Sequence, residues 1–434
     1  MICNSECIVL TDFCKMRKGV RLILIIIYQV FAFTSFPQAN DYPYLAESYD
    51  FIRYDLNRFN FYGNDTNYTH LHQLYDDLIL KGEGKMKIVH IGGSHIQADI
   101  YSNRMRKRLQ TFHPGMNGGR GFVFPYSIAG TTNPSNYYVR YSGEWESCRN
   151  VETKKQCVLG LSGILVATHD TTASFSIKLS DRADTYYDFN IIRIFYENDS
   201  ASFNLEASTS CNIMEVIENK ELGYRLYKLD RYTDSVCLSV KKTNSFQDHF
   251  IFYGMSLETE DPGVVYHSIG INGAKLTSYL RCNLLEEHLK ALEPDWIILS
   301  IGTNDANYRY FKPEEYKQHY DSLISIITRA IPGAAILLTV PNDSYLYRRY
   351  VNRNTEEVKK VIEEIAVNYN CGVWDFYTIM GGLNSIVAWQ HFNLAARDRI
   401  HFTVSGYLLM GDLFFDAFLK SYEDHLDMKK ADLE

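Results

Sequence analysis

Four short segments of the sequence carry residues that together could perform acyl transfer. Ser94 follows two glycines at the end of an apolar run, where its hydroxyl could act as a nucleophile. Gly273 lies in the turn-like stretch SIGINGA, and Asn304 follows the apolar run WIILSIGT. Backbone and carboxamide N–H groups at these two positions could stabilise an oxyanion. Asp398 and His401 are three residues apart, a spacing that lets a carboxylate orient an imidazole base.

Each segment has an ordinary structural explanation when it is taken alone. A serine before a helix is commonly an N-cap, a glycine turn commonly joins a strand to a helix, and an Asp-x-x-His pair commonly lies on the surface. The GxSxG elbow of α/β-hydrolases is absent, because the sequence around Ser94 is GGSHI. Only the combination of the four segments indicates the chemistry.

The elements that must position these residues alternate between strand-like and helix-like segments. Apolar runs predict strands at 87–91, 264–269, 296–301, 335–340 and 372–376. Amphipathic stretches predict helices at 100–112, 276–292, 313–330, 355–369 and 404–419. This alternation favours an α/β domain with a parallel sheet covered on both faces, which binds ligands at the carboxyl ends of its strands. We expect the four segments to meet at that edge.

Residues 135–258 have a different pattern, with short runs rich in tyrosine, phenylalanine and β-branched residues separated by turn residues. These runs predict strands at 137–141, 175–179, 190–196, 202–207, 224–229, 236–241 and 250–255. Seven short strands without a long helix favour an antiparallel β-sandwich. The predicted organisation is an α/β domain formed by residues 40–134 and 259–434, with the sandwich of residues 135–258 inserted between its first two strands.

The N-terminal residues 1–39 are predicted to be a signal peptide. Arg17, Lys18 and Arg21 precede an apolar stretch, and small residues follow it, which is the layout of a secretory signal. The preceding residues fit no targeting pattern, so Met16 is the expected start. An uncleaved N-terminal anchor is the alternative. We expect a periplasmic or secreted protein with no membrane span in the mature chain.

Composition and charge exclude several classes of protein. Of 434 residues, 46% are hydrophobic and 22% charged, which argues against disorder. The net charge is −8 and no long basic block occurs, so nucleic acid is not an expected partner. The basic residues of segment 104–108 are expected to form a solvated helix face. Six cysteines follow residue 39 and permit disulfides, but no CxxC pair supports a structural zinc site.

In their order along the chain, the four segments resemble the four blocks of the SGNH or GDSL hydrolase superfamily. The segments IGTND and DRIHFTVSGY match closely, whereas the common Gly-Asp-Ser of the first block is Gly-Gly-Ser here. The resemblance implies a flavodoxin-like three-layer fold and a triad of Ser94, His401 and Asp398. It also implies an oxyanion hole formed by Ser94, Gly273 and Asn304. No metal or cofactor is implied.

The octapeptide GGSHIQAD, the later GGRGF at 118–122 and the long β insertion resemble bacterial peptidoglycan O-acetylesterases, which carry a carbohydrate-binding-like β-module at this point. This resemblance implies an exported esterase that removes O-acetyl groups from a glycan, with peptidoglycan as the candidate. Two alternatives stay open. They are an O-acetyltransferase that uses the same triad and a non-catalytic glycan-binding protein.

Aromatic residues of the insertion and one histidine are candidate substrate contacts. Most of the tyrosines are expected in the core of the sandwich. Those in a polar, glycine-containing stretch are expected to be exposed and to stack on sugars: Tyr137, Tyr138, Tyr141 and Trp145. His95 directly follows the candidate nucleophile, and we expect it to contact substrate or to start a helix.

Overall fold

The computed structural model describes residues 48–63, 66–180 and 187–431. The predicted signal peptide, residues 1–39, and the expected start at Met16 lie outside the described residues. Within the described part of the chain, no helix is both long and apolar enough to cross a membrane.

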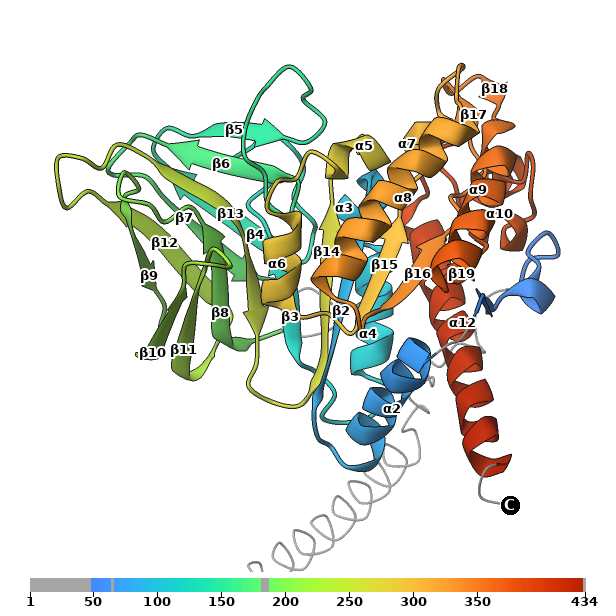
Figure 1. Cartoon of the computed structure of the whole chain (residues 1–434), viewed down its shortest axis with the longest axis horizontal. Coiled ribbons are helices and arrows are strands. Elements are labelled where there is room, and N and C mark those ends of the chain that lie inside the picture. Colours follow the sequence, from blue (N-terminus) through green and yellow to red (C-terminus); the bar gives the residue numbers. More distant parts are fainter. Residues whose placement is uncertain (1–47, 64–65, 181–186, 432–434) are drawn as a thin grey trace, which may run out of the picture. The chain divides into compact units, whose positions relative to one another are not determined.

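A six-stranded sheet forms the centre of the α/β part (Figure 1). In spatial order its strands are β1 (Phe59–Phe61), β19 (Gly372–Trp374), β16 (Ala335–Thr339), β15 (Trp296–Ser300), β2 (Lys85–Gly92) and β14 (Gly263–Gly270). All neighbouring pairs are parallel except β1 with β19. The five parallel strands are those predicted from the apolar runs, and they read as continuous hydrophobic segments because both faces are covered.

Helices cover the two faces of this sheet in separate layers. One buried cluster joins alternate strand residues such as Ile88 and Ile298 to the helices α2 (Thr66–Leu80), α4 (Tyr101–Gln110) and α12 (Val404–Ala431). The other joins residues such as Val89 and Leu299 to α6 (Leu285–Leu292), α8 (Pro313–Ala330) and α9 (Asn354–Tyr369). Side chains of a strand alternate between its faces, so each strand contributes to both layers.

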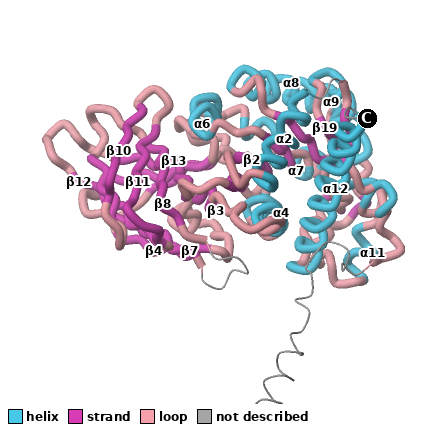
Figure 2. The backbone as a smooth tube through the Cα atoms, turned by 90° about the horizontal axis from the view of Figure 1, so that it is seen from below, coloured by secondary structure: helices cyan, strands magenta, loops and turns pink. Residues whose placement is uncertain are grey.

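The chain leaves this sheet after β2 and builds two antiparallel sheets before it returns at β14 (Figures 1 and 2). One has four strands, in the order β4 (Tyr137–Ser142), β7 (Ser174–Leu179), β12 (Ser235–Lys241) and β9 (Asn204–Ser208). The other has seven, of which six follow the order β10 (Ile213–Asn219), β11 (Tyr224–Thr233), β8 (Phe189–Tyr196), β13 (Phe250–Glu258), β6 (Ile164–Thr168) and β5 (Glu146–Arg149). The seventh, β3 (Gly119–Val123), pairs with β13.

The predicted fold class, a parallel α/β sheet with antiparallel β-structure inserted, is confirmed. Cys148 and Cys157 form a disulfide within the inserted part, whereas Cys211, Cys237, Cys282 and Cys371 are free.

Two predicted helices differ from the observed ones. The stretch predicted as one helix at 276–292 is divided into α5 (Leu276–Tyr279) and α6. Between them, the Leu284 N–H donates to the Leu159 carbonyl at 3.0 Å, and Arg281 donates to the Asn150 carbonyl at 2.6 Å. These bonds to the inserted part replace the continuation of the helix. The last helix, predicted to end at 419, continues to Ala431 because Tyr422 and His425 are buried near α2.

The helix α2 and the strands β1, β3, β5, β6 and β10 had no prediction from the sequence. Several further short elements had none either. They are η2 (Tyr54–Leu56), α3 (Ser94–Gln97), α7 (Thr303–Ala306), β17 (Tyr345–Leu346), β18 (Tyr350–Val351), α10 (Phe376–Ile379) and α11 (Ile386–His391). Most span four residues or fewer, which is too short for a hydrophobic period to be recognised.

Candidate active site

The candidate nucleophile lies at the start of α3, immediately after β2. The Ser94 Oγ is 2.9 Å from the His401 Nε2, and the His401 Nδ1 is 2.7 Å from the Asp398 Oδ2. With the Nδ1–H donating to the carboxylate, the Nε2 is left as the acceptor for the serine hydroxyl. The structure therefore joins three of the sequence-predicted residues, 307 positions apart at the widest, in one hydrogen-bonded chain.

The carboxylate of Asp398 is held by the backbone that directly follows it. Its Oδ1 accepts the backbone N–H groups of Ile400 and His401, both at 3.0 Å. Burial raises the pKa of this carboxyl, but the hydrogen bonds from the His401 ring and the two amides outweigh burial and hold its pKa below the ordinary value. Asp398 therefore stays ionised and fixes the tautomer of His401.

The site is open to solvent. The side chain of His401 is 36% exposed and that of Asp398 is 23% exposed. Water can therefore reach the base directly, and a bulky substrate does not have to bury itself to reach it.

The turn that contains Gly273 is fastened to the nucleophile segment. The Ile271 N–H donates to the Gly92 carbonyl at 3.2 Å, and the Asn272 N–H donates to the Gln97 Oε1 at 2.7 Å. Gly273 has φ +83°, and a Cβ built there would meet nothing within 4 Å. The backbone conformation, not lack of space, therefore favours glycine at this position.

Asn304 lies in α7, directly after β15. Its Nδ2 donates to the Ala274 carbonyl at 3.0 Å. A carboxamide has two N–H groups, so one remains for a ligand. A Cβ built on Gly93 would lie 3.2 Å from this Nδ2, so the residue before the nucleophile lies against the carboxamide. The three predicted oxyanion positions thus gather at the carboxyl ends of the adjacent strands β14, β2 and β15.

Asp305, beside Asn304, is a buried carboxyl that the sequence analysis did not single out. Its Oδ1 accepts the Leu276 N–H at 3.3 Å, and its Oδ2 has no hydrogen-bond partner. Burial raises its pKa to about 7. The bond ties the start of α5 to α7, and both flank the candidate oxyanion positions.

His95 lies beside the candidate base. Its Nδ1 is 2.8 Å from the Tyr407 Oη, and its ring centroid is 5.2 Å from that of His401. Its Nε2 is buried and has no hydrogen-bond partner. Burial is the main cause that lowers the pKa of His95 to about 3, and the neighbouring His401 contributes to this lowering. The ring is therefore neutral near pH 7. As expected, it lies at a helix start; its role toward substrate stays a prediction.

The four aromatic candidates of the insertion have different environments. Tyr137 was expected to be exposed, and this is wrong. Its side chain is buried, because its Oη donates to the Phe124 carbonyl at 2.7 Å and its ring faces the core. Tyr138 and Tyr141 are 45% and 53% exposed. They are three residues apart on β4, so they point to opposite faces of the strand. Trp145 is partly buried against Phe175, with 5.8 Å between ring centroids.

A buried ionic network links the end of the nucleophile segment to the inserted part. Asp99 pairs with Arg106 at 3.1 Å and also with Arg120, and it accepts the Asn136 Nδ2 at 2.7 Å. Burial raises the pKa of Asp99, but the two guanidinium groups outweigh it and lower that pKa. Arg106 was expected on a solvated face and is fully buried instead. The expectation failed because Arg106 donates to the Tyr266 carbonyl of β14 and to Asp99, which lie outside its own helix.

Comparisons with known proteins concern the family and the fold. Residues 246–409 match the GDSL-like lipase/acylhydrolase family. No curated protein matches the chain. Among solved structures, one described as a peptidoglycan O-acetylesterase in action is similar with a TM-score of 0.69 and 22% identity, covering 84% of this chain and 99% of that one. The predicted resemblance to SGNH/GDSL hydrolases is thereby confirmed, and the likeness to the solved structure establishes the common fold.

Two further structures are similar over a smaller part of the chain. An acetylxylan esterase, Axe2 from Geobacillus stearothermophilus, has 24% identity and a TM-score of 0.29, covering 37% of this chain and 73% of that one. A lipase/acylhydrolase from Enterococcus faecalis has 22% identity and a TM-score of 0.29, covering 36% of this chain and 75% of that one.

Proposed function

We propose that this chain is a serine esterase that removes O-acetyl groups from a glycan. The observation that carries the proposal is the hydrogen-bonded chain from Ser94 through His401 to Asp398, with bonds of 2.9 and 2.7 Å. The match of residues 246–409 to the GDSL-like lipase/acylhydrolase family supports the reaction class.

In the acylation step, the Nε2 of His401 takes the proton of the Ser94 hydroxyl as its Oγ attacks the acetyl carbonyl carbon. The carbonyl π electrons move onto oxygen and form a tetrahedral oxyanion. Collapse of this intermediate breaks the bond to the sugar oxygen, which leaves with the proton from His401. The product is an acetyl ester on Ser94, and Asp398 stabilises the imidazolium while it lasts.

The oxyanion needs donors that are in place before the reaction. The backbone N–H groups of Ser94 and Gly273 and the second N–H of the Asn304 carboxamide are the proposed set. One such donor is worth about 2.7–4 kcal/mol of barrier. The bond from Asn304 to the Ala274 carbonyl at 3.0 Å holds the carboxamide in place without using both of its N–H groups.

Deacylation uses the same groups with water as the nucleophile. His401 takes a proton from water, the hydroxyl oxygen attacks the acetyl carbon, and the Ser94 oxygen leaves and recovers the proton. One ester and one water thus give one sugar hydroxyl and one acetic acid. The exposure of the His401 side chain favours entry of water. An O-acetyltransferase would instead pass the acetyl group to a second sugar hydroxyl.

Two adjoining cavities are the proposed contact for the glycan, the first between α4 and the inserted part and the second on the inserted part. One, of about 790 Å³, is lined by polar residues that include Asn103, Asn136 and Tyr138. The second, of about 480 Å³, lies over the four-stranded sheet and shares Tyr138 and Arg140 with the first. No acidic residue is among the described residues that line either cavity. Amide and hydroxyl groups can bond to sugar hydroxyls, and the ring of Tyr138 offers a stacking face.

The cavities are linked to the nucleophile segment. Asn136 lines the first cavity and donates to Asp99, which follows α3, while Gln97 of α3 donates to Thr131 at 3.0 Å. A glycan bound there would therefore contact the loops whose hydrogen bonds position the segment that contains Ser94. Peptidoglycan is the proposed glycan, as in the description of the similar solved structure. The predicted signal peptide supports a periplasmic or secreted location for the protein, which is where this substrate lies.

The direct test is acetate release by the purified full chain. O-acetylated peptidoglycan, O-acetylated xylan and p-nitrophenyl acetate would be compared, with Ser94→Ala as the control. We expect acetate from peptidoglycan at the highest kcat/KM and none above background with Ser94→Ala. Acetate release from none of the three substrates would contradict an esterase, and acetyl transfer to an added glycan in place of acetate would support the transferase.

A further inference from the structure

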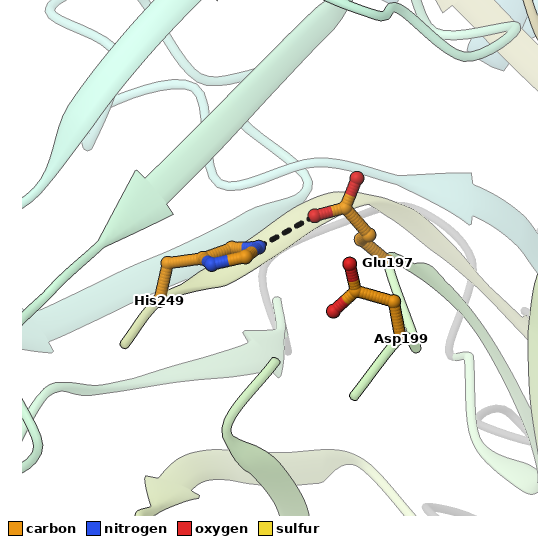
Figure 3. A group of neighbouring side chains, drawn as sticks. All are labelled: Glu197, Asp199 and His249. Carbon is orange, nitrogen blue, oxygen red and sulfur yellow. Dashed lines mark hydrogen bonds and ion pairs between the residues drawn. The ribbon is translucent and has the colours of Figure 1, made fainter. Parts of the chain in front are cut away.

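A group of three metal-ligating side chains lies in the inserted part, on segments not used by the proposed esterase site (Figure 3). Glu197 follows β8, Asp199 lies in the turn to β9, and His249 directly precedes β13. One ligand atom from each lies within 4.8 Å of the others. Figure 3 shows both carboxylates directed toward the edge of the imidazole.

The backbone holds the three residues together. The Phe203 N–H donates to the His249 carbonyl at 2.6 Å, and the Asp248 N–H donates to the Ala201 carbonyl at 2.9 Å. Asp199 accepts the N–H groups of Ala201 and Ser202 through its Oδ1 alone, at 2.9 and 2.8 Å. The Oδ2 of Asp199 accepts no hydrogen bond from the described residues and remains available.

The imidazole is oriented as in metal sites that have a supporting carboxylate. The Nδ1 of His249 is 2.6 Å from the Asp248 Oδ1, and its Nε2 is 2.6 Å from the Glu197 Oε2. Metal-ligating histidines commonly donate one ring N–H to a carboxylate, which leaves the other nitrogen for the metal. Here Asp248 takes the Nδ1–H, and a metal ion would replace the proton that the Nε2 shares with Glu197.

The charge at this place is unbalanced. Three carboxylates, those of Glu197, Asp199 and Asp248, surround one imidazole. Within the described residues, His249 is the only basic group in an ion pair with Glu197 or Asp248, and Asp199 has no ion pair. Even with a protonated imidazole the cluster carries a net charge of −2, and a divalent cation that displaced the Nε2 proton would reduce it to −1.

We propose that Glu197, Asp199 and His249 bind a first-row divalent transition-metal ion, for which Zn²⁺ is the probe. One imidazole and two carboxylates leave a fourth position for water in a tetrahedral site. Ca²⁺ prefers six to eight oxygen ligands, so an imidazole disfavours it. Asp199 is exposed, so an ion can reach the group from solvent. The bound ion would tie the β8–β9 turn to the start of β13.

The test uses the purified full chain after chelator treatment and dialysis. Isothermal titration with ZnCl₂ is expected to show one site per chain that is lost in His249→Ala and in Glu197→Gln. Zn²⁺ is expected to raise the Tm of the parent protein and not of these variants. Asp248→Asn, which removes only the supporting carboxylate, is expected to weaken Zn²⁺ binding by about 10–100-fold.

His113→Ala is the control, because His113 is an exposed histidine after α4 that lies outside the ligand group and bonds only to the neighbouring Pro114 carbonyl among the described residues. It should bind Zn²⁺ as the parent does. Circular dichroism and unchanged p-nitrophenyl acetate hydrolysis would show that each variant is folded. Should His249→Ala fail to fold, Glu197→Gln decides alone. No binding by the parent, or equal binding by parent and His249→Ala or Glu197→Gln, would overturn the proposal and leave a plain ion pair.

Discussion

The side chain of Gln97 accepts the backbone N–H of Asn272 at 2.7 Å, and this bond fastens the helix that begins at Ser94 to the turn that contains Gly273. The same side chain donates to the Thr131 Oγ and the Thr132 carbonyl at 3.0 and 3.1 Å. Gln97 therefore connects three segments: the nucleophile, one oxyanion position and the loop that leads to the inserted part.

Gln97→Leu is expected to lower kcat for p-nitrophenyl acetate by about tenfold to a hundredfold with little change in KM, because a small displacement of the oxyanion donors from the nucleophile is costly. Gln97→Glu keeps an acceptor for the Asn272 N–H and should recover part of the rate. Steady-state kinetics of both variants would check this. Equal rates for Gln97→Leu and the parent would show that the bond does not position the site.

Asp398→Asn is expected to reduce kcat by about 10³–10⁴-fold, because an amide no longer fixes the tautomer of His401 or supports the imidazolium. The exposed Asp424 on α12 gives a control, Asp424→Asn, which should retain full activity. Kinetics with p-nitrophenyl acetate would measure both. A loss of less than tenfold in Asp398→Asn would argue that another group orients the base.

The two cavities predict that variants of their lining residues affect the hydrolysis of polymeric substrates but not of small ones. Tyr138→Ala and Arg140→Ala are expected to raise KM for O-acetylated glycan by about tenfold, because side-chain contacts of this kind are worth about 1–1.5 kcal/mol. Hydrolysis of p-nitrophenyl acetate should not change. Tyr141→Ala is the matched control, since Tyr141 is exposed on the same strand but on its other face. Equal effects of Tyr138→Ala and Tyr141→Ala on glycan KM would rule out this face as the contact.

Asp305 predicts a pH dependence of stability. Its pKa is about 7 in the folded chain and 3.8 ordinarily, so the unfolded chain loses this proton first as pH rises. The free energy of unfolding should therefore fall by about 2–4 kcal/mol between pH 4 and pH 7, and no further above pH 7. Asp305→Asn should remove this part of the dependence. Denaturant unfolding at pH 4, pH 7 and pH 8 would measure it, with the exposed Glu314→Gln as a control that behaves as the parent.

Much of the fold and the main groups of the site follow from the sequence because they obey local rules. The apolar runs predicted the five parallel strands. Because parallel strands present their carboxyl ends at one edge of the sheet, Ser94, Gly273 and Asn304 were expected to lie close together. The spacing of Asp398 and His401 permits their contact, and the combination with the other three segments predicted it.

The residues that were missed depend on partners distant in sequence. Gln97 contacts Asn272, 175 residues away, and no local pattern indicates this bond. Tyr137 was misjudged because a polar neighbourhood does not reveal which face of a strand is buried. The alternation along β4 indicates it only once the register is known, since Tyr137 pairs with the buried Leu179. Arg106 was misjudged because it donates to the Tyr266 carbonyl, 160 residues away, and to Asp99 in the turn before its helix.

The central claim is that Ser94 is a nucleophile activated by His401. Treating the full chain with a fluorophosphonate probe and mapping the modified peptide by mass spectrometry tests this claim most directly. We predict a single stoichiometric adduct on Ser94, which is absent in Ser94→Ala and forms at least about a hundredfold more slowly in His401→Ala. An adduct at another serine, or no adduct in a folded parent protein, would contradict the account.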